Sequence, residues 1–171
     1  MRNVLVVVDM QRDFVDGALG TPEAVAIVPG VVEKVKAFSG KVIFTRDTHG
    51  EDYLQTREGG LLPVAHCIRG TPGWELIDAL QPYAGEIIDK PTFGSVTLGE
   101  RMRELDAEEQ IGVITLIGVC TDICVISNAM LLRAFLPETP IVIEGACCAG
   151  VTPESHDTAL KAMAACQFSI I

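Results

Sequence analysis

The sequence predicts an α/β fold: a three-layer sandwich with a parallel sheet of about six strands and helices on both faces. Short runs of β-branched residues alternate along the chain with stretches of helical periodicity. The strand-like runs are apolar at successive positions, as in strands that are buried on both faces. The chain has 171 residues, which is the length of one domain. We therefore expect a single domain over residues 1–171.

The expected strands are short apolar runs. The clearest is Val4–Val8, a run of five β-branched or aliphatic residues close to the N-terminus. The weakest is Gln167–Ile171 at the other end of the chain. The runs between them are Lys41–Thr45, Glu86–Asp89, Gly112–Ile117 and Ile141–Glu144.

Helices are expected between these strands. Ala24–Phe38 has apolar residues at a period close to 3.6, and Pro29 inside it predicts that the helix itself begins at Pro29. Thr152 is the expected N-cap of Pro153–Ala165, which has proline at its first helical position. His156 in that helix is interpreted as a surface or capping residue. The remaining expected helices are Leu98–Leu105 and Cys124–Phe135.

Composition excludes several classes of function. Lys plus Arg is 13 and Asp plus Glu is 23, so the net charge is −10 and nucleic acid or an anionic membrane surface is an unfavourable partner. The apolar runs are strand-sized, far short of the roughly 20 residues of a membrane span. No signal-peptide pattern precedes Val4–Val8. We expect a soluble, cytoplasmic protein whose six cysteines, none in a CxxC pair, are reduced.

Reactive residues follow the predicted strands, where the open edge of a parallel sheet binds ligands. Asp9 follows the first strand, Lys90 the third, and Cys124 comes shortly after the fourth. Thr121 or Asp122 is expected to cap a helix with Cys124 in its first turn, so that the helix dipole and Lys90 lower the pKa of the thiol. Asp9 could then accept the thiol proton.

Each of these three residues also has an ordinary structural interpretation. Cys124 could pack in the core, Asp9 could cap a strand end, and Lys90 could be a solvated surface lysine. Taken together, one carboxylate, one ammonium and one thiol from three strand ends favour a site with a cysteine nucleophile.

The polar segment Asp47–Pro72 is too long for a simple connection, which favours a functional loop. It offers carboxylate and imidazole ligands of the kind that Zn, Mn or Fe accept, although the spacing alone also fits a solvated loop. The candidate metal ligands are Asp47, His49, Glu58 and His66.

Three strings in order along the chain resemble the cysteine hydrolases of the isochorismatase-like superfamily, of which the nicotinamidases are the best-known branch. They are VDMQRDF at 8–14, DKPTFGS at 89–95 and GVCTDICV at 118–125. The resemblance covers nearly the whole chain and implies that Asp9, Lys90 and Cys124 form a catalytic triad.

The same resemblance implies a metal site and a substrate site. Asp47, His49 and His66 match the ligands of a divalent metal, Zn in the first place and Mn or Fe otherwise, and Glu58 matches the fourth ligand. The backbone N–H groups of Cys120 and Cys124 would hold the oxyanion, and the Val119–Cys120 peptide would be cis. The residues that match contacts to a flat substrate are Phe14 and Phe93.

One departure from many nicotinamidases concerns the substrate. They often carry a pocket tryptophan just ahead of the residue matched by His66, where this chain has Leu62-Pro63-Val64. The only tryptophan, Trp74, is expected to be structural. The amide that the protein acts on is therefore left open.

The predicted function is cysteine-dependent hydrolysis of a small carboxamide through an acyl-thioester, which releases ammonia and a carboxylic acid. The alternatives are an isochorismatase-type hydrolase of a vinyl ether, whose known enzymes lack the nucleophilic cysteine, and a non-catalytic relative. A phosphoryl receiver fits poorly because Asp9 is followed by Met10 rather than by a second acid. The expected partners are a small-molecule amide and, by analogy with the family, further copies of the chain in a homo-oligomer.

Overall fold

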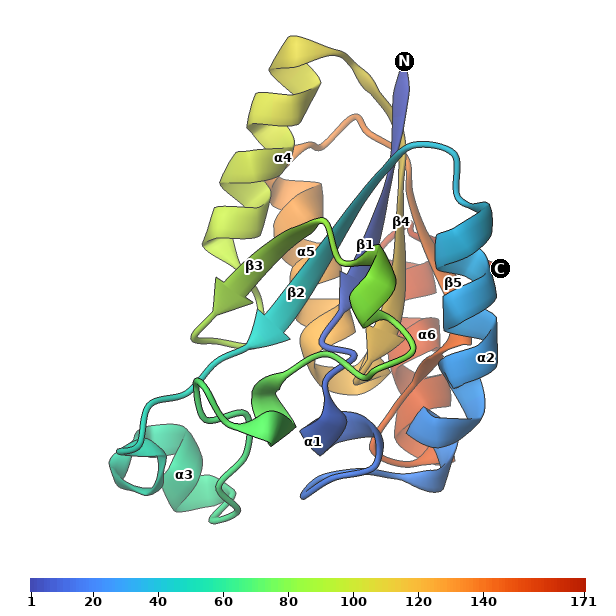
Figure 1. The fold of residues 1–171 in the computed structure, drawn as a ribbon. Coiled ribbons are helices and arrows are strands. Elements are labelled where there is room, and N and C mark those ends of the chain that lie inside the picture. The colour runs from blue at the N-terminus through green and yellow to red at the C-terminus, as the bar shows by residue number, and fades with distance from the viewer.

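The centre of the protein is a sheet of six parallel strands in the order β3-β2-β1-β4-β5-β6 (Figure 1). The computed structural model describes all residues, Met1–Ile171. The chain winds outward from β1 in one direction and then from β4 in the other, so the order reverses between these two strands. The strands are β1 (Arg2–Val8), β2 (Lys41–Asp47), β3 (Glu86–Lys90), β4 (Ile111–Val119), β5 (Ile141–Ala149) and β6 (Ser169–Ile170).

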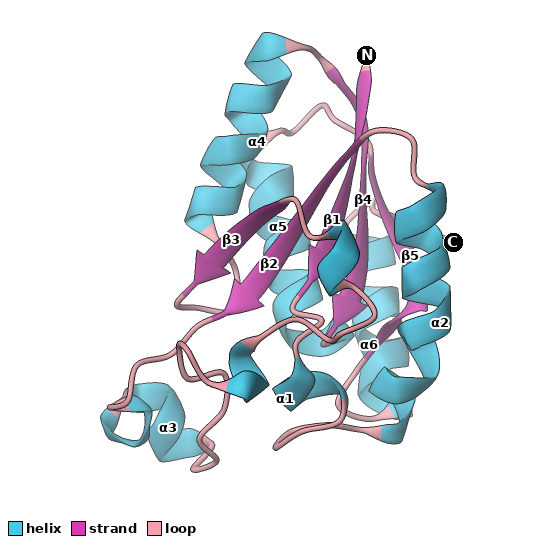
Figure 2. Ribbon diagram, viewed as in Figure 1, coloured by secondary structure: helices cyan, strands magenta, loops and turns pink.

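Helices cover both faces of the sheet, which confirms the predicted three-layer fold (Figure 2). A π-helical turn, Thr121–Val125, joins β4 to α5, and 3₁₀ turns lie at Tyr53–Gln55, Pro72–Trp74 and Gln81–Tyr83. The α-helices are α1 (Arg12–Val15), α2 (Pro22–Ala37), α3 (Arg57–Leu61), α4 (Val96–Glu108), α5 (Ile126–Phe135) and α6 (Pro153–Ala165). None of them is both long enough and apolar enough to cross a membrane.

The alternation of side chains along β1 divides the core into two layers. Val4, Val6 and Val8 pack on one face with residues of α4, α5 and α6. Leu5 and Val7 pack on the other face with residues of α1 and α2. All five side chains have no exposed surface, because β1 is a central strand covered on both sides.

Every predicted strand is present, and β2 to β5 extend further toward their carboxyl ends than the apolar runs indicated. The predicted start of the second helix is wrong. The helix α2 begins at Pro22, because Thr21 caps it by accepting a hydrogen bond from Ala24 N and Pro22 occupies its first position. Pro29 lies inside the helix, where it removes one backbone donor without ending the helix.

Candidate active site

The carboxyl ends of the strands bring the predicted triad together. Lys90, the last residue of β3, lies with its Nζ 2.7 Å from Asp9 Oδ2 and 3.5 Å from Cys124 Sγ. It also donates to the carbonyl oxygen of Thr92 at 3.2 Å and lies 3.4 Å from Asp47 Oδ1. Asp9 and Lys90 have no exposed surface, so the interpretation of Lys90 as a solvated surface lysine is wrong.

Lys90 is held in its charged form despite its burial. Burial alone would lower the pKa of an ammonium group, but the negative charge of Asp9, with smaller contributions from the neighbouring Cys124 and Asp47, outweighs it. The pKa of Lys90 is therefore raised well above its usual value. A permanent cation lies between the carboxylate and the thiol.

Asp9 is presented by an unusual backbone conformation. Its φ of 48° is in the left-handed region, directly after the last residue of β1. Its Oδ1 accepts a hydrogen bond of 2.6 Å from Thr45 Oγ1, and its Oδ2 lies 2.7 Å from Lys90 Nζ. Burial raises the pKa of Asp9 against the opposing effect of Lys90. Lys90 is the only charged group paired with Oδ2.

Cys124 lies in the π-helical turn after β4, and the sequence-based account of its environment is wrong in two respects. Neither Thr121 nor Asp122 caps the turn by a side-chain hydrogen bond. The pKa of the Cys124 thiol is raised well above its usual value, because burial and the neighbouring Asp9 outweigh the charge of Lys90. This environment therefore favours the neutral thiol over the thiolate.

The turn is fixed at its start by backbone geometry. The Val119–Cys120 peptide is cis, as the family resemblance implied. Gly118 has φ of 115°, and a Cβ there would meet the carbonyl oxygen of Val8 at 2.2 Å, so only glycine allows β1 and β4 to approach this closely. Burial raises the pKa of the Cys120 thiol to about 12, and the N–H of Cys120 forms no hydrogen bond within the protein.

Side chains from α6 and its preceding loop hold the outer side of the turn. Thr121 Oγ1 and His156 Nδ1 form a hydrogen bond of 2.8 Å, and Asp122 Oδ1 accepts one of 3.1 Å from Val151 N. His156 is half-buried and does not cap α6, whose N-cap is Thr152 as predicted. The interpretation of His156 as a surface or capping residue is therefore wrong.

Asn128 holds the inner side of the turn and was not identified from the sequence. Its side-chain nitrogen donates to the carbonyl oxygens of Cys124 at 2.8 Å and of Phe93 at 3.1 Å. Its Oδ1 accepts from Ser95 N at 2.9 Å. This fully buried amide ties α5 and the nucleophile to the loop that follows Lys90. The position of an amide side chain one helical turn after the cysteine was the only signal in the sequence.

The four predicted metal ligands gather next to the triad. One ligand atom from each of Asp47, His49, Glu58 and His66 lies within 4.8 Å of the others. Asp47 Oδ2 is 2.8 Å from His49 Nε2 and 3.7 Å from His66 Nε2, and Glu58 Oε1 is 3.6 and 3.7 Å from the same two nitrogens. Two imidazoles and two carboxylates at this spacing form a set that suits a divalent transition metal.

Contacts behind these ligands orient them. His66 Nδ1 is 2.8 Å from the carbonyl oxygen of Val64, to which it can donate, and this leaves Nε2 free to bind a cation. Gln11 accepts from Asp47 N and donates to Asp47 O. Burial acts to raise the pKa of Asp47, but hydrogen bonds from His49 and His66 and the charge of Lys90 hold it well below its usual value.

A cavity of about 380 Å³ joins the nucleophile to this group. Both predicted substrate contacts, Phe14 and Phe93, lie on its wall with Cys120 and Cys124. The polar lining from the ligand group consists of Asp47, Glu58 and His66. The sequence did not identify the other lining residues, which are Leu19, Thr21, Leu61, Leu62, Ile123 and Val151.

Trp74 lies outside this cavity, as expected. Its Nε1 donates to Thr48 Oγ1 at 2.8 Å, and the guanidinium of Arg46 stacks on its ring with 3.6 Å to the centroid. The tryptophan thus supports the end of β2, on which Asp47 lies.

Comparisons with known proteins agree with this geometry. The family profile described as "Isochorismatase domain" matches residues 3–171. The chain belongs to the isochorismatase family. This member is 31% identical to the uncharacterized isochorismatase family protein PncA of Bacillus subtilis (strain 168), over 94% of this chain and 93% of that protein.

Solved structures of the family share the fold over the whole chain. The crystal structure of nicotinamidase/pyrazinamidase PncA from Bacillus subtilis superposes with a TM-score of 0.85 at 30% identity, and covers 99% of both chains. The pyrazinamidase of Pyrococcus horikoshii in complex with zinc gives 0.84 at 29% identity, and covers 100% of this chain and 99% of that one.

Proposed function

We propose that this isochorismatase-family protein is a cysteine amidohydrolase of a small carboxamide, which it converts to a carboxylic acid and ammonia through a thioester on Cys124. The observation that supports this most directly is the position of Lys90, with its Nζ 2.7 Å from Asp9 Oδ2 and 3.5 Å from the sulfur of Cys124, a residue that lines the cavity. Relatives named nicotinamidase and pyrazinamidase support hydrolysis of a C–N bond as the reaction class.

In the first step, Cys124 Sγ attacks the amide carbon while its proton passes to Asp9 Oδ2. Thr45 occupies Oδ1, so Oδ2, which is paired only with Lys90, is the oxygen to receive this proton, and the raised pKa of Asp9 suits it to the transfer. Lys90 remains charged and stabilises the negative charge that moves from the carboxylate toward the sulfur. The backbone N–H groups of Cys120 and Cys124 would donate to the oxyanion.

In the second step, the tetrahedral adduct collapses. Asp9 returns the proton to the amide nitrogen, the C–N bond breaks, and ammonia departs. An acyl-thioester remains on Cys124. Asp9 then takes a proton from water, the resulting hydroxide adds to the thioester carbon, and the C–S bond breaks. The sulfur regains its proton from Asp9 and the carboxylic acid leaves.

A divalent cation fits the group of Asp47, His49, Glu58 and His66, and zinc is the first choice for two imidazoles and two carboxylates. When bound, it supplies a Lewis-acidic position on the cavity wall that can hold a substrate lone pair or a water. The carboxylates of Asp47 and Glu58 give this group the negative charge that a cation requires. Lys90 Nζ lies between the group and the nucleophile, 3.4 Å from Asp47 Oδ1 and 3.5 Å from Cys124 Sγ.

Intact-protein mass spectrometry with an ammonia assay tests the proposed reaction. A panel of carboxamides including nicotinamide, pyrazinamide and benzamide is offered to the wild-type protein. We expect ammonia in a one-to-one ratio with the acid, and, after acid quench, a protein mass increased by the acyl group on the peptide that contains Cys124. Turnover of a vinyl ether such as isochorismate with no ammonia released from any amide would favour the alternative hydrolase.

Elemental analysis tests the metal site separately. We expect about one equivalent of zinc, manganese or iron per chain, lost in a His49→Ala/His66→Ala variant that still folds by circular dichroism. The double variant His156→Ala/Cys166→Ser changes two potential ligands outside the group and should keep its metal. Metal retained by the first variant would contradict this site.

A further inference from the structure

The cavity continues beyond the reacting groups, and its outer part differs from its inner part. Its volume is about 380 Å³, whereas an apolar cavity of about 150 Å³ already holds a benzene molecule. A carboxamide with a single six-membered ring, placed against Cys124, would leave much of this space unfilled. The outer walls would therefore contact the part of the substrate that lies beyond its carboxamide.

Almost no polar side chain faces this outer space. Apart from the inner carboxylates, His66 and the two cysteine thiols, the only polar lining residue is Thr21. The hydroxyl oxygen of Thr21 already caps α2 by accepting a hydrogen bond from Ala24 N at 3.0 Å. A polar substituent on the distal part of a substrate would lose its hydration here without a matching gain.

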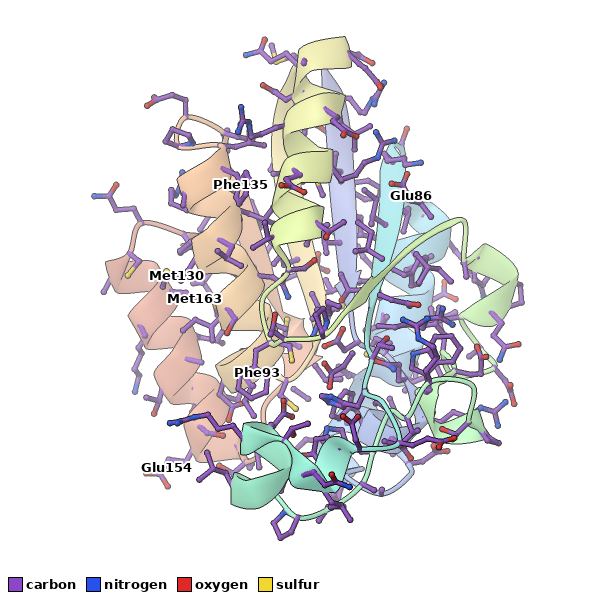
Figure 3. All side chains as sticks on the ribbon, turned by 90° about the vertical axis from the view of Figure 1, so that its left-hand side faces the viewer. Glu86, Phe93, Met130, Phe135, Glu154 and Met163 are labelled. Carbon is purple, nitrogen blue, oxygen red and sulfur yellow. The ribbon has the colours of Figure 1, made fainter.

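The mouth of the cavity is bordered by exposed apolar side chains. We call this border the apolar rim; it consists of Leu61, Leu62, Phe93 and Val151. Leu61 and Leu62 lie at the end of α3, Phe93 follows β3 and Val151 follows β5. The four residues are 39–79% exposed. In Figure 3, Phe93 lies directly above the segment that holds α3. Single exposed apolar residues are common, but four around one mouth mark a binding surface.

We infer that the preferred substrate is a primary carboxamide whose acyl group is apolar and extends beyond one six-membered ring, so that its distal part covers the apolar rim. This inference rests on the proposed amide hydrolysis. It concerns specificity alone, because none of the hydrogen bonds and ion pairs of Lys90 and Asp9 involves a rim side chain. The reacting end would be selected by the triad, and the remainder by burial of apolar surface.

A homologous series of 4-alkylbenzamides, from benzamide to 4-butylbenzamide, tests this inference. We expect kcat/KM to rise by up to about fourfold for each methylene that reaches the rim, which is the effect of burying one methylene group. A terminal hydroxyl on the alkyl chain should cancel the gain. A Leu61→Gln variant should lower the ratio of kcat/KM for 4-butylbenzamide to that for benzamide by about fourfold or more.

Leu54→Gln is the matched control, because Leu54 is 57% exposed in the same loop but does not line the cavity. It should leave the ratio unchanged. Benzamide hydrolysed as fast as its longer homologues would overturn the inference and leave the proposed reaction intact, whereas failure to hydrolyse any amide would overturn both. A change of oligomeric state in Leu61→Gln, measured by light scattering, would assign the rim to contacts between copies and overturn the inference.

Discussion

The two ends of β3 each carry an ion-pair cluster, and the clusters differ in almost every physical respect. At the first residue, Glu86 pairs with Arg101 at 2.7 Å and with Lys41 at 2.7 Å, and all three side chains are partly exposed. At the last residue, Lys90 pairs with Asp9 at the same distance, and neither is exposed. The strand β3 therefore has a solvent-exposed ion-pair cluster at Glu86 and a buried one at Lys90.

Burial explains why the pKa shifts at the two ends have opposite signs. Hydrogen bonds from Arg101 outweigh partial burial and lower the pKa of Glu86, as in an ordinary surface ion pair. Burial raises the pKa of Asp9 even though Lys90 is adjacent. Taking charges out of water costs several kcal/mol per ion, so the buried cluster is better explained by chemistry than by stability. Substitutions at each end of β3, with turnover and the free energy of unfolding measured for each, test whether the buried cluster serves chemistry rather than stability.

The largest expected effect is the loss of turnover in Cys124→Ser. An alcohol is a far weaker nucleophile than a thiol that can ionise as it attacks, so kcat should fall by about a thousandfold or more while the free energy of unfolding barely changes. Steady-state kinetics and urea unfolding of the same preparations measure both quantities.

Two other cysteines serve as controls for this variant. Cys166→Ser changes an exposed thiol and should have wild-type kinetics, and Cys120→Ser should keep much more activity than Cys124→Ser because its proposed role uses the backbone. Near wild-type hydrolysis by folded Cys124→Ser would contradict thiol catalysis. The Asp9 and Lys90 pair acting on water would then be the leading mechanism.

The next effect compares the two ends directly. Lys90→Met leaves Asp9 buried without a cation, which should lower the free energy of unfolding by about 3–5 kcal/mol. Arg101→Met removes the partner of a solvated carboxylate and should cost about 1 kcal/mol or less. Urea unfolding at pH 7 measures both differences. If both variants lost the same free energy of unfolding, burial of the Lys90 cluster would not affect the cost of removing a charge.

A double variant separates the cost of an unpaired charge from the value of the pair. Asp9→Asn/Lys90→Met replaces both charges with neutral groups of similar size and should recover most of the stability lost in Lys90→Met, without recovering turnover. A double variant as unstable as Lys90→Met would indicate that the pair itself stabilises the fold.

A smaller effect is expected at Asn128, which supports the buried end without carrying charge. Asn128→Ala removes three hydrogen bonds, to Ser95 N and to the carbonyl oxygens of Cys124 and Phe93, at a cost of about 2–3 kcal/mol. If it also positions the nucleophile, kcat should fall more than KM changes. Asn128→Asp keeps the acceptor but buries a carboxyl group against two carbonyl oxygens, so it should recover none of the stability. Unchanged kcat in both variants would leave Asn128 a purely structural role.

The elements and the reacting residues were predictable because both follow local patterns. Apolar runs specify the strands, and the topology of a parallel sheet brings residues that follow different strands to one edge. Asp9, Lys90 and Cys124 could be chosen on that basis before any distance was known. The start of α2 was not predictable from Pro29 alone, because packing of the helix against the sheet tolerates an interior proline.

The electrostatics and the cavity walls depend on contacts that no local pattern encodes. The Cys124 thiol was expected to have a lowered pKa from two favourable neighbours, but complete burial reverses the sign. Leu19, Leu61 and Val151 belong to segments far apart in the sequence, and their common position on the cavity wall follows only from the tertiary fold. Loop packing therefore sets the limit of what the sequence could predict.

The smallest effect is the pH dependence of the solvated end. The pKa of Glu86 is lowered in the folded protein, so its ionised form stabilises the fold at neutral pH by about 1 kcal/mol or less, and this contribution is lost as the pH falls through the folded pKa. The difference in unfolding free energy between wild type and Glu86→Gln should be constant from about pH 8 to pH 5 and shrink below about pH 4. For Asp9→Asn, the difference in unfolding free energy should change with pH in the opposite direction. The raised pKa of Asp9 makes the folded wild type less stable as the pH rises. A difference for Glu86→Gln that persists to about pH 2 would mean that Glu86 acts through packing rather than charge, and the contrast between the two ends of β3 would then rest on burial alone.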